Sequence, residues 1–183
     1  LSFSPLFYAK NLFEEVYRYT LAARAIASEE PFDLIHAHDW LSIGAGIAAK
    51  EVSHKPLVFH VHATEFDRTG GNGVNQDVYE IEREGMEKAD SIIAVSHYTK
   101  NIITDRYGID PSKVRVVHNA IDAGEIKPPL SEKLSQLKSQ GMKLVVFVGR
   151  ITLQKGPDYF LKAAKNVLTH NPQVMFIMSG SGD

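Results

Sequence analysis

The sequence predicts an α/β fold built from parallel sheets, and three observations lead to this prediction. Short apolar runs rich in Ile and Val alternate along the chain with stretches of helical periodicity, as in parallel strands joined by right-handed helical crossovers. The runs are almost continuously apolar, which is typical of strands covered by helices on both faces. The pattern lapses once, over residues 123–142, and then resumes, which indicates two α/β units.

The first unit should contain four helices and four strands. Residues 10–29 place apolar side chains at helical spacing opposite a polar face. Residues 39–53 form a helical stretch rich in small side chains that can pack closely, and Pro56 stands at a strand entrance, where its missing N–H is tolerated. In chain order we expect a helix over 10–29, a strand over 32–38, a helix over 39–53, a strand over 55–63, a polar, glycine-rich loop over 64–76, a helix over 77–89, a strand over 90–96, a helix over 97–108 and a strand over 113–122.

A linker and a second unit follow. Pro128 and Pro129 break the chain, and a short, polar, amphipathic helix comes after them. Next come a strand over 143–150, a loop over 151–156, a helix over 157–171 and a strand over 173–183. We therefore expect a first domain over residues 1–125, an interdomain linker over 126–142 and a second domain over 143–183. The sequence lacks an initiator Met and ends on "SGSGD" directly after an apolar run, so we interpret it as an internal fragment with both domains incomplete.

Composition excludes several classes of protein. The net charge of −2 argues against general attraction to nucleic acid or to an anionic membrane. The absence of cysteine excludes a disulfide framework and thiolate metal ligands. No apolar stretch approaches the roughly 20 residues that a membrane helix needs. We expect a soluble, cytoplasmic protein with no integral membrane segment and no nucleic-acid partner. The sequence does not indicate an oligomeric state.

Unusual residues, all polar except one glycine, gather where the expected strands end, which is the edge at which open α/β sheets bind ligands. They are His36, His38 and Asp39 at one strand, His60 and His62 at the next, Ser96 at the third, Asn119 and Asp122 at the fourth, and Gly149 and Arg150 at the first strand of the second unit. A single histidine at a strand end would indicate little. The convergence of several strands on one edge predicts a site.

Two His-x-His pairs contain four of the eight histidines. Strand residues two apart face the same side, so each pair could direct both imidazoles at one ion, as in a metal-dependent hydrolase. Alternatively, His36 and His60 lie one step inside the edge and are core or interlayer histidines bonded to backbone, which leaves His38 and His62 as the functional pair.

The stretch "VGRITLQKG" at residues 148–156 places Arg150 at a strand end and Lys155 just before a helix. Backbone N–H groups and the helix dipole favour an anion at such a position, and the two cations suit a diphosphate. Solvated surface charges are the alternative. Gly180, in the turn after the last strand, would permit close approach by a ligand, and residues 69–76 are either a loop beside a binding site or an ordinary surface loop.

The chain resembles the family 4 retaining glycosyltransferases, and among them the glycogen and starch synthase-like members. Six motifs carry the resemblance over almost the whole chain: "HAHDW", "FHVHATEFDR", "ADSIIAVSHYTKNII", "VRVVHNAID", "VVFVGRITLQKGPDYFLKAA" and "MFIMSGSGD". The resemblance implies two Rossmann-like domains facing each other across a cleft (the GT-B fold), an acceptor-binding first domain and a donor-binding second domain. It also implies transfer of a sugar, glucose in the synthase-like members, from a UDP- or ADP-linked nucleotide diphosphate sugar to a glycan or other hydroxyl acceptor, with retention of configuration and without a bound metal or other cofactor.

The resemblance also implies roles for individual residues. His62 would contact the donor sugar near the reacting carbon, and Arg150 and Lys155 would stabilise the departing diphosphate; we expect these three to be the catalytic residues. The residues expected to bind the donor are Asn119, Gly149, Arg150, Lys155 and Gly180. Those expected to bind the acceptor are His38, Asp39, Glu65 and Asp67. We expect no residue to bind a metal.

The sequence departs from the family pattern in what it lacks. Ala120 occupies a position where glycine is commoner, and the first glycine-rich strand and loop and the later acidic E-x7-E segment are absent. The donor-binding site would then be incomplete, so we expect the isolated chain to be inactive or nearly so. Three other hypotheses remain: a metal-dependent hydrolase using the His-x-His pairs, a non-catalytic nucleotide-binding module, and a sugar-nucleotide 2-epimerase of similar fold.

Overall fold

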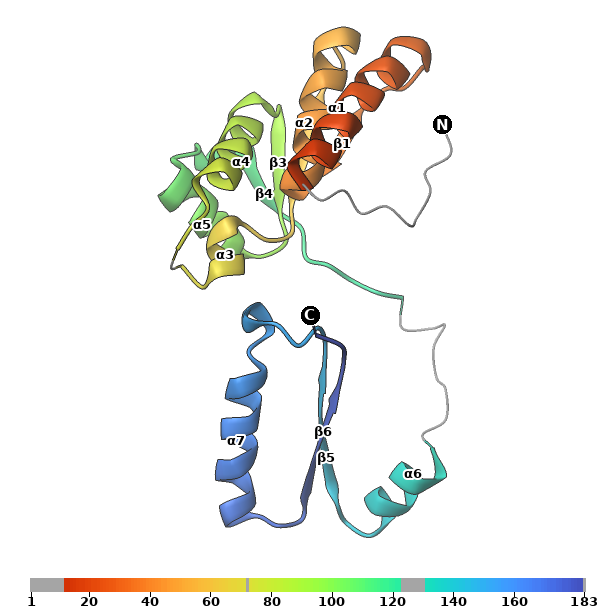
Figure 1. Ribbon diagram of the computed structural model, residues 1–183, viewed down its shortest axis with the longest axis vertical. Coiled ribbons are helices and arrows are strands. Elements are labelled where there is room, and N and C mark those ends of the chain that lie inside the picture. Colours follow the sequence, from red (N-terminus) through yellow and green to blue (C-terminus); the bar gives the residue numbers. More distant parts are fainter. Residues whose placement is uncertain (1–11, 72, 123–130, 183) are drawn as a thin grey trace. The chain divides into compact units, whose positions relative to one another are not determined.

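The computed structural model describes residues 12–71, 73–122 and 131–182, and the chain forms two compact units, Leu1–Ala120 and Ile121–Asp183 (Figure 1). Both units are α/β and both sheets are parallel, as the alternating pattern predicted. The first domain was expected to end at residue 125, whereas the first compact unit ends at Ala120.

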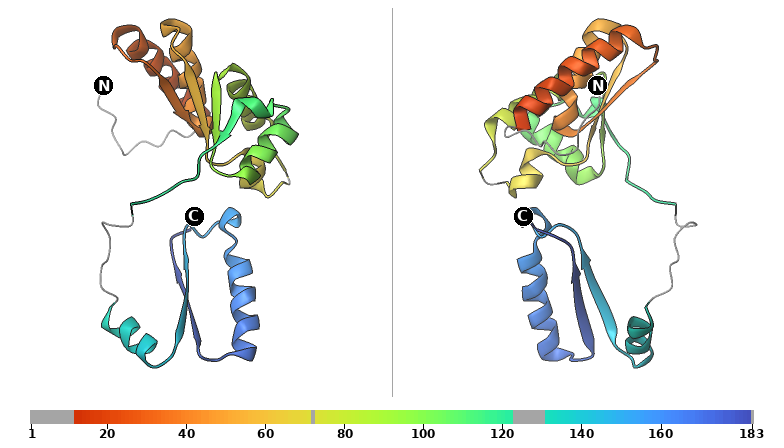
Figure 2. Two further views of the ribbon diagram at one scale, coloured as in Figure 1. Left: turned by 180° about the vertical axis from the view of Figure 1, so that it is seen from behind. Right: turned by 45° about the vertical axis from the view of Figure 1, so that its right-hand side comes forward.

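The first unit contains a four-stranded parallel sheet in the order β1-β2-β3-β4. Its strands are β1 (Ile35–His38), β2 (Leu57–Val61), β3 (Ser91–Ala94) and β4 (Val114–Val116). The helices are α1 (Leu12–Glu29), α2 (Asp39–Ser53), α3 (Glu65–Thr69), α4 (Gln76–Lys88) and α5 (His97–Tyr107), with a short 3-10 turn η1 (Pro111–Lys113) before β4. Helix α1 packs along α2, and the two appear side by side in red and orange in the left view of Figure 2.

The hydrophobic core lies on one face of this sheet. Phe59 of β2 and Ile92 of β3 are fully buried there, against Ile43 of α2, Met86 of α4 and Ile103 of α5. Every crossover runs in the same direction along the sheet, and right-handed crossovers of that kind place their helices on the same face. Side chains on the other face are half-buried or exposed. The expectation that helices cover both faces was therefore wrong for the described residues.

Close packing between α2 and α4 depends on glycine. A Cβ at Gly85 of α4 would lie 2.2 Å from Cγ1 of Ile43 in α2, much closer than two carbon atoms can approach. Gly46 of α2 similarly approaches Ala37 of β1, where a Cβ would lie 2.9 Å from the alanine Cβ. Gly46 thus lets α2 lie close against the sheet, and Gly85 lets α4 lie close against α2.

Two local features differ from the sequence-based expectation. The expected loop over 64–76 contains the five-residue helix α3, which begins with a capping box between Thr64 and Asp67. Strand β4 covers only Val114–Val116, although a strand over 113–122 was expected. Pairing with β3 ends at Val116 opposite Ala94, so the following residues leave the sheet.

The second unit contains a two-stranded parallel sheet, β5 (Lys143–Val148) and β6 (Val174–Ser179), preceded by α6 (Glu132–Ser139). A 3-10 turn, η2 (Leu153–Lys155), and helix α7 (Pro157–His170) connect the strands. Helix α7 runs alongside them (Figure 1) and packs through Phe160, whose ring centroid lies 5.4 Å from that of Phe147 and 5.6 Å from that of Phe176. Within the part of the chain that is described, no helix is long and apolar enough to cross a membrane.

Candidate functional site

Four imidazoles form a cluster at the carboxyl end of β1 and β2, which we call the histidine cluster: His36, His38, His60 and His62. The parallel register places His38 opposite His60, and alternation along each strand puts His36 and His60 on the same face. Ring centroids lie 4.4 Å apart for His36 and His38, and 4.2 Å apart for His60 and His62. The rings of His36 and His60 stack at 5.3 Å with an interplanar angle of 4°.

Within the cluster, the pKa values of His38 and His60 are lowered, which favours the neutral form of these two imidazoles. Burial lowers the pKa of His60 to about 4, and repulsion from His62, His38 and His36 adds to this effect while Asp39 opposes it. The pKa of His38 is also lowered, by partial burial first and then by His36 and His62. Neutral imidazoles can act as hydrogen-bond acceptors and as metal ligands.

The two histidines of the expected functional pair meet. Nδ1 of His38 lies 2.9 Å from Nε2 of His62, so one ring donates a hydrogen bond to the other. Both side chains are exposed. The backbone N–H of His38 donates to Oγ of Ser42 at 2.6 Å, and that hydroxyl lies at the same distance from the His38 carbonyl oxygen, which fixes the end of β1.

His36 and His60 do not fit the alternative that they are core or interlayer histidines bonded to backbone. His36 is exposed. Both ring nitrogens of His60 are shielded from solvent, and neither has a hydrogen-bond partner among the described residues. Leaving a buried polar atom unpaired costs about 1–3 kcal/mol. That interpretation was wrong because the sheet face carrying these two residues lies opposite the core.

Asp39, expected to contact the acceptor, supports the neighbouring loop. Its Oδ1 accepts hydrogen bonds from the backbone N–H of His62 at 2.7 Å and of Ala63 at 3.3 Å. Asp39 has φ of 55°, a left-handed conformation that is uncommon outside glycine. This backbone turn between β1 and α2 directs the carboxylate across to the end of β2.

Glu65 and Asp67, also expected to contact the acceptor, make bonds within the protein. The carboxylate of Asp67 accepts from the N–H of Thr64 at 2.7 Å and from its hydroxyl at 2.8 Å. Glu65 is buried, and its carboxylate accepts from Nε of Arg68 at 3.1 Å and from the N–H of Asn75 at 3.3 Å. Both carboxylates thus hold the segment after His62, and their role towards an acceptor stays a prediction.

A buried network behind this segment was missed by sequence reasoning. Glu82 of α4 is 1% exposed, and its carboxylate accepts from Arg68, from the hydroxyl of Tyr107 and from the N–H of Glu65. Burial raises the pKa of Glu82, against the opposing pull of these donors. The spacing of Val78, Glu82, Gly85 and Met86, which form the buried side of α4, was the available signal because it places a carboxylate on an apolar helix face.

The other strand ends of the first unit carry Ser96 and Asn119. The hydroxyl of Ser96 caps α5 by accepting from the N–H of Thr99 at 3.0 Å, so it has a structural partner. Asn119 is exposed, three residues beyond β4. The ring centroid of its neighbour His118 lies 6.1 Å from the ring centroid of His97, at the start of α5. The sheet edge thus presents exposed polar groups after β3 and β4 as well.

In the second unit, Arg150 follows β5 and Lys155 ends η2, directly before α7. Both are exposed, and the described residues offer neither side chain an ion pair. Gly156 is the N-cap of α7 with φ of 63°, and it provides no side-chain cap for the N–H groups of the first turn. Two cations beside an uncapped helix N-terminus form a setting that favours an anion.

Glycines join the two strand ends of the second unit. The N–H of Gly149 donates to the carbonyl of Ser179 at 3.1 Å, and that of Ile151 to the carbonyl of Ser181 at 2.8 Å. A Cβ at Gly180 would lie 1.8 Å from the carbonyl oxygen of Gly149, whereas a Cβ at Gly149 would meet nothing closer than 3.9 Å. Glycine is therefore required at position 180 by the neighbouring backbone, and the approach of a ligand there stays a prediction.

Comparison with known proteins matches this chain to glycosyltransferases. The model of Glycosyltransferase Family 4 matches residues 3–125. The chain is 31% identical over 167 residues to an uncharacterized glycosyltransferase, MJ1607, of Methanocaldococcus jannaschii, covering 86% of the chain and 42% of that protein. It is 28% identical over 153 residues to the glycogen synthase of Mycobacterium tuberculosis, covering 82% of the chain and 36% of the synthase. The chain thus spans about two fifths of the length of these relatives.

Solved structures share the fold. HepE of Anabaena, determined in complex with UDP and glucose, superimposes with a TM-score of 0.67 at 20% identity, covering 98% of this chain and 46% of HepE. At this identity the likeness concerns the fold, which is the Rossmann-like α/β architecture of the GT-B glycosyltransferases, as the sequence predicted.

Proposed function

Because this chain belongs to Glycosyltransferase Family 4, we propose that the protein it forms transfers a sugar from a nucleotide diphosphate sugar to a glycan or other hydroxyl acceptor. We further propose that the sugar is glucose, that UDP or ADP carries it, and that its configuration is retained. The match to a glycogen synthase supports glucose, and the complex of HepE with UDP and glucose supports a uridine nucleotide. Transfer in this proposal needs no bound metal or other cofactor.

One observation carries the donor side of the proposal. Arg150 and Lys155 are exposed cations beside the uncapped N-terminus of α7, and a diphosphate is the part of the donor that such a setting would hold. The guanidinium of Arg150 can donate two hydrogen bonds to two oxygens of one phosphate, and the ammonium of Lys155 supplies a positive charge on a flexible side chain. Asp158 in the first helical turn would repel an anion, but Lys162 lies 3.3 Å from its carboxylate and offsets that charge. Gly149 leaves room for close backbone approach, and Asn119 is an exposed amide for the donor.

The proposed role of the two cations is to stabilise the negative charge that develops on the leaving diphosphate. As the bond between the sugar carbon and the diphosphate oxygen breaks, negative charge grows on the leaving group, and Arg150 and Lys155 stabilise it. The acceptor oxygen forms the new bond to the same carbon from the same face. Its proton passes to an oxygen of the departing diphosphate. No carboxylate of the chain serves as a nucleophile in this proposal.

The first unit would serve the sugar and the acceptor. His62 is exposed, with its backbone fixed by Asp39 and its ring bonded to His38, so it can contact the donor sugar in a defined orientation. His38 and the residues around Asp39, Glu65 and Asp67 are the proposed acceptor side. Because the chain spans about two fifths of its relatives, we propose that a longer cytoplasmic protein carries the activity and that the 183-residue chain alone turns over little or no substrate.

A turnover assay tests this function. UDP-glucose and ADP-glucose are offered with glycogen, short maltooligosaccharides or a sugar phosphate to the longer protein and, separately, to the 183-residue chain. The proposal predicts release of UDP or ADP coupled to a glucosylated product in the longer protein, with the α-linkage of the donor retained. Product with inverted linkage would refute retention, and robust turnover by the chain alone would refute the proposed need for further residues. No transfer by the longer protein with any pair would refute the function itself.

A further inference from the structure

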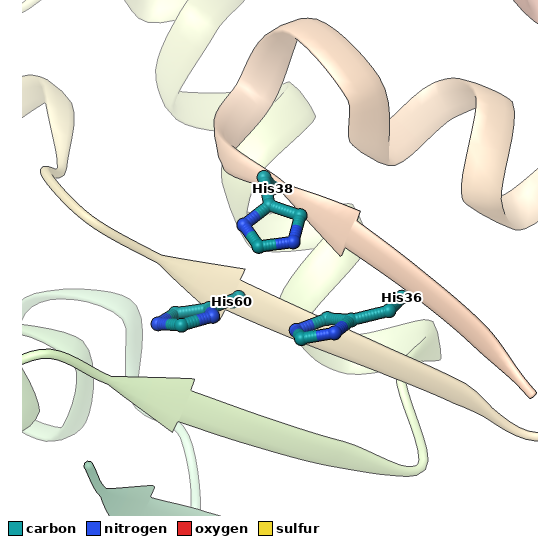
Figure 3. A group of neighbouring side chains, drawn as sticks. All are labelled: His36, His38 and His60. Carbon is teal, nitrogen blue, oxygen red and sulfur yellow. The ribbon is translucent and has the colours of Figure 1, made fainter. Parts of the chain in front are cut away.

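Three members of the histidine cluster are arranged as metal ligands. Among residues 12–71, 73–122 and 131–182, one nitrogen from each of His36, His38 and His60 lies within 4.8 Å of the other two. Figure 3 shows the three rings, from two neighbouring strands, with nitrogen atoms turned towards a common space. The His-x-His spacing of β1 supplies two ligands on one face, and the register of β2 brings in the third.

The geometry requires only a small adjustment. A tetrahedral zinc site has Zn–N distances of about 2.0–2.1 Å, which places ligand nitrogens about 3.3 Å apart. The distance between any two of the three ligand nitrogens must therefore shorten by at most roughly 1.5 Å. His36 and His38 are exposed, so their side chains can rotate without displacing a packed core.

The pattern of hydrogen bonds points independently to a missing ligand. Within the described part of the chain, neither ring nitrogen of His60 has a hydrogen-bond partner, although both are shielded from solvent. In His38, Nδ1 is engaged with Nε2 of His62, which leaves Nε2 of His38 for an ion. Histidines that bind metals usually donate a hydrogen bond from their second nitrogen, and His62 is placed to accept it.

We propose that His36, His38 and His60 form a binding site for a divalent zinc ion, with His62 as the hydrogen-bond partner of the ligand His38. Three imidazoles suit zinc and leave a fourth position for water. The proposed sugar transfer requires no ion at this site, and the site departs from the expectation that no residue binds a metal. Its consequence for His62 is orientation, because a bound ion makes Nδ1 of His38 the donor and Nε2 of His62 the acceptor.

Zinc titration of the 183-residue chain tests the site. Equilibrium dialysis and calorimetry should give one zinc per chain, and zinc should raise the unfolding temperature. His36→Gln is the key variant because His36 is exposed and its loss should leave the fold intact, which circular dichroism checks. Binding should be abolished in His36→Gln and His60→Ala, and weakened on the order of 10–100-fold in His62→Ala, which removes a partner outside the ligand set.

Matched controls come from other exposed histidines. His170→Ala in α7 and His97→Ala in α5 should bind zinc as the unaltered chain does. Cobalt substitution should give the intense visible absorption of a tetrahedral site in the unaltered chain and not in His36→Gln. The proposal is overturned if no zinc binds at micromolar concentrations, if His36→Gln binds as well as the unaltered chain, or if His97→Ala abolishes binding. Zinc binding and sugar transfer are measured by separate readouts, so the two proposals can fail separately.

Discussion

The carboxylate of Asp39 at the end of β1 accepts hydrogen bonds from the backbone N–H groups of His62 and Ala63 beyond β2. Two neighbouring strand ends are thereby tied together at the position where His62 leaves the sheet. The bond explains why a charged residue stands in a left-handed conformation at the first position of α2. Asp39 is in this account a positioning residue for His62.

Asp39→Ala should release the loop that carries His62. Hydrogen bonds to a charged group contribute about 1.5–3 kcal/mol, so the amides of His62 and Ala63 should exchange with solvent on the order of tenfold faster or more. Hydrogen exchange measured by NMR checks this, with Asp33→Ala, an exposed aspartate, as the control. Unchanged exchange at His62 in Asp39→Ala would show that the carboxylate does not hold the loop.

Arg68→Met should destabilise the first unit strongly, because it leaves the carboxylate of Glu82 buried without its cation. Breaking such a pair costs about 3–5 kcal/mol, whereas replacing both partners by apolar side chains is often close to neutral. The double variant Arg68→Met/Glu82→Leu should therefore recover part of the lost stability. Urea unfolding of the single and double variants gives the coupling, and additive losses would contradict a coupled buried pair.

The lowered pKa of Asp90 should make the free energy of unfolding depend on pH. The N–H of Leu57 and the ammonium of Lys50 lower the pKa of Asp90 below its ordinary value of 3.8. A depressed pKa in the folded state gives stability that is present above the unfolded pKa and is lost as pH falls through the folded pKa. The advantage of the unaltered chain over Asp90→Asn should thus be constant near neutral pH and shrink below 3.8.

Unfolding free energies of the two proteins across the acidic range provide this measurement. The effect should be modest because the Asp90 side chain is 49% exposed. A difference between the two proteins that stays the same down to the lowest pH would contradict the assignment.

Two glycines of the second unit should respond differently to alanine. Gly180→Ala forces a methyl group against the carbonyl oxygen of Gly149 and should destabilise the unit by about 1–3 kcal/mol or more. Gly149→Ala has room for its methyl group and should leave stability nearly unchanged, but it should weaken UDP-glucose binding if the diphosphate approaches this backbone. Chemical unfolding and calorimetry separate the two effects. Equal stability of both variants would contradict the close approach of the strand ends.

The order of helices and strands could be predicted from the sequence because period and apolar content are local signals. Residues 39–53, for example, were expected to form a helix, and α2 covers Asp39–Ser53. Helix α3 was missed because it is five residues long in a polar, glycine-rich stretch, although Thr64 and Asp67 have the spacing of a capping box. Short elements carry too few residues for periodicity to show.

The environment of the site residues could not be predicted in the same way. Which sheet face is buried depends on the side to which each crossover takes its helix, and strand sequence alone does not specify this for His36 and His60. The resemblance likewise implied acceptor contacts for Asp39 and Asp67, and it gave no sign that their carboxylates also accept hydrogen bonds from nearby backbone N–H groups. Such partners depend on three-dimensional proximity.

Arg150 and Lys155, the cations before α7, are proposed to stabilise the leaving diphosphate. The rate of sugar transfer in three variants of the longer protein tests this role most directly. Arg150→Ala and Lys155→Ala should each lower the rate of transfer from UDP- or ADP-glucose on the order of a hundredfold or more, the range seen when one transition-state donor is removed. Lys165→Ala, an exposed lysine of α7, should transfer as the unaltered protein does. Undiminished transfer in Arg150→Ala and Lys155→Ala would contradict the account.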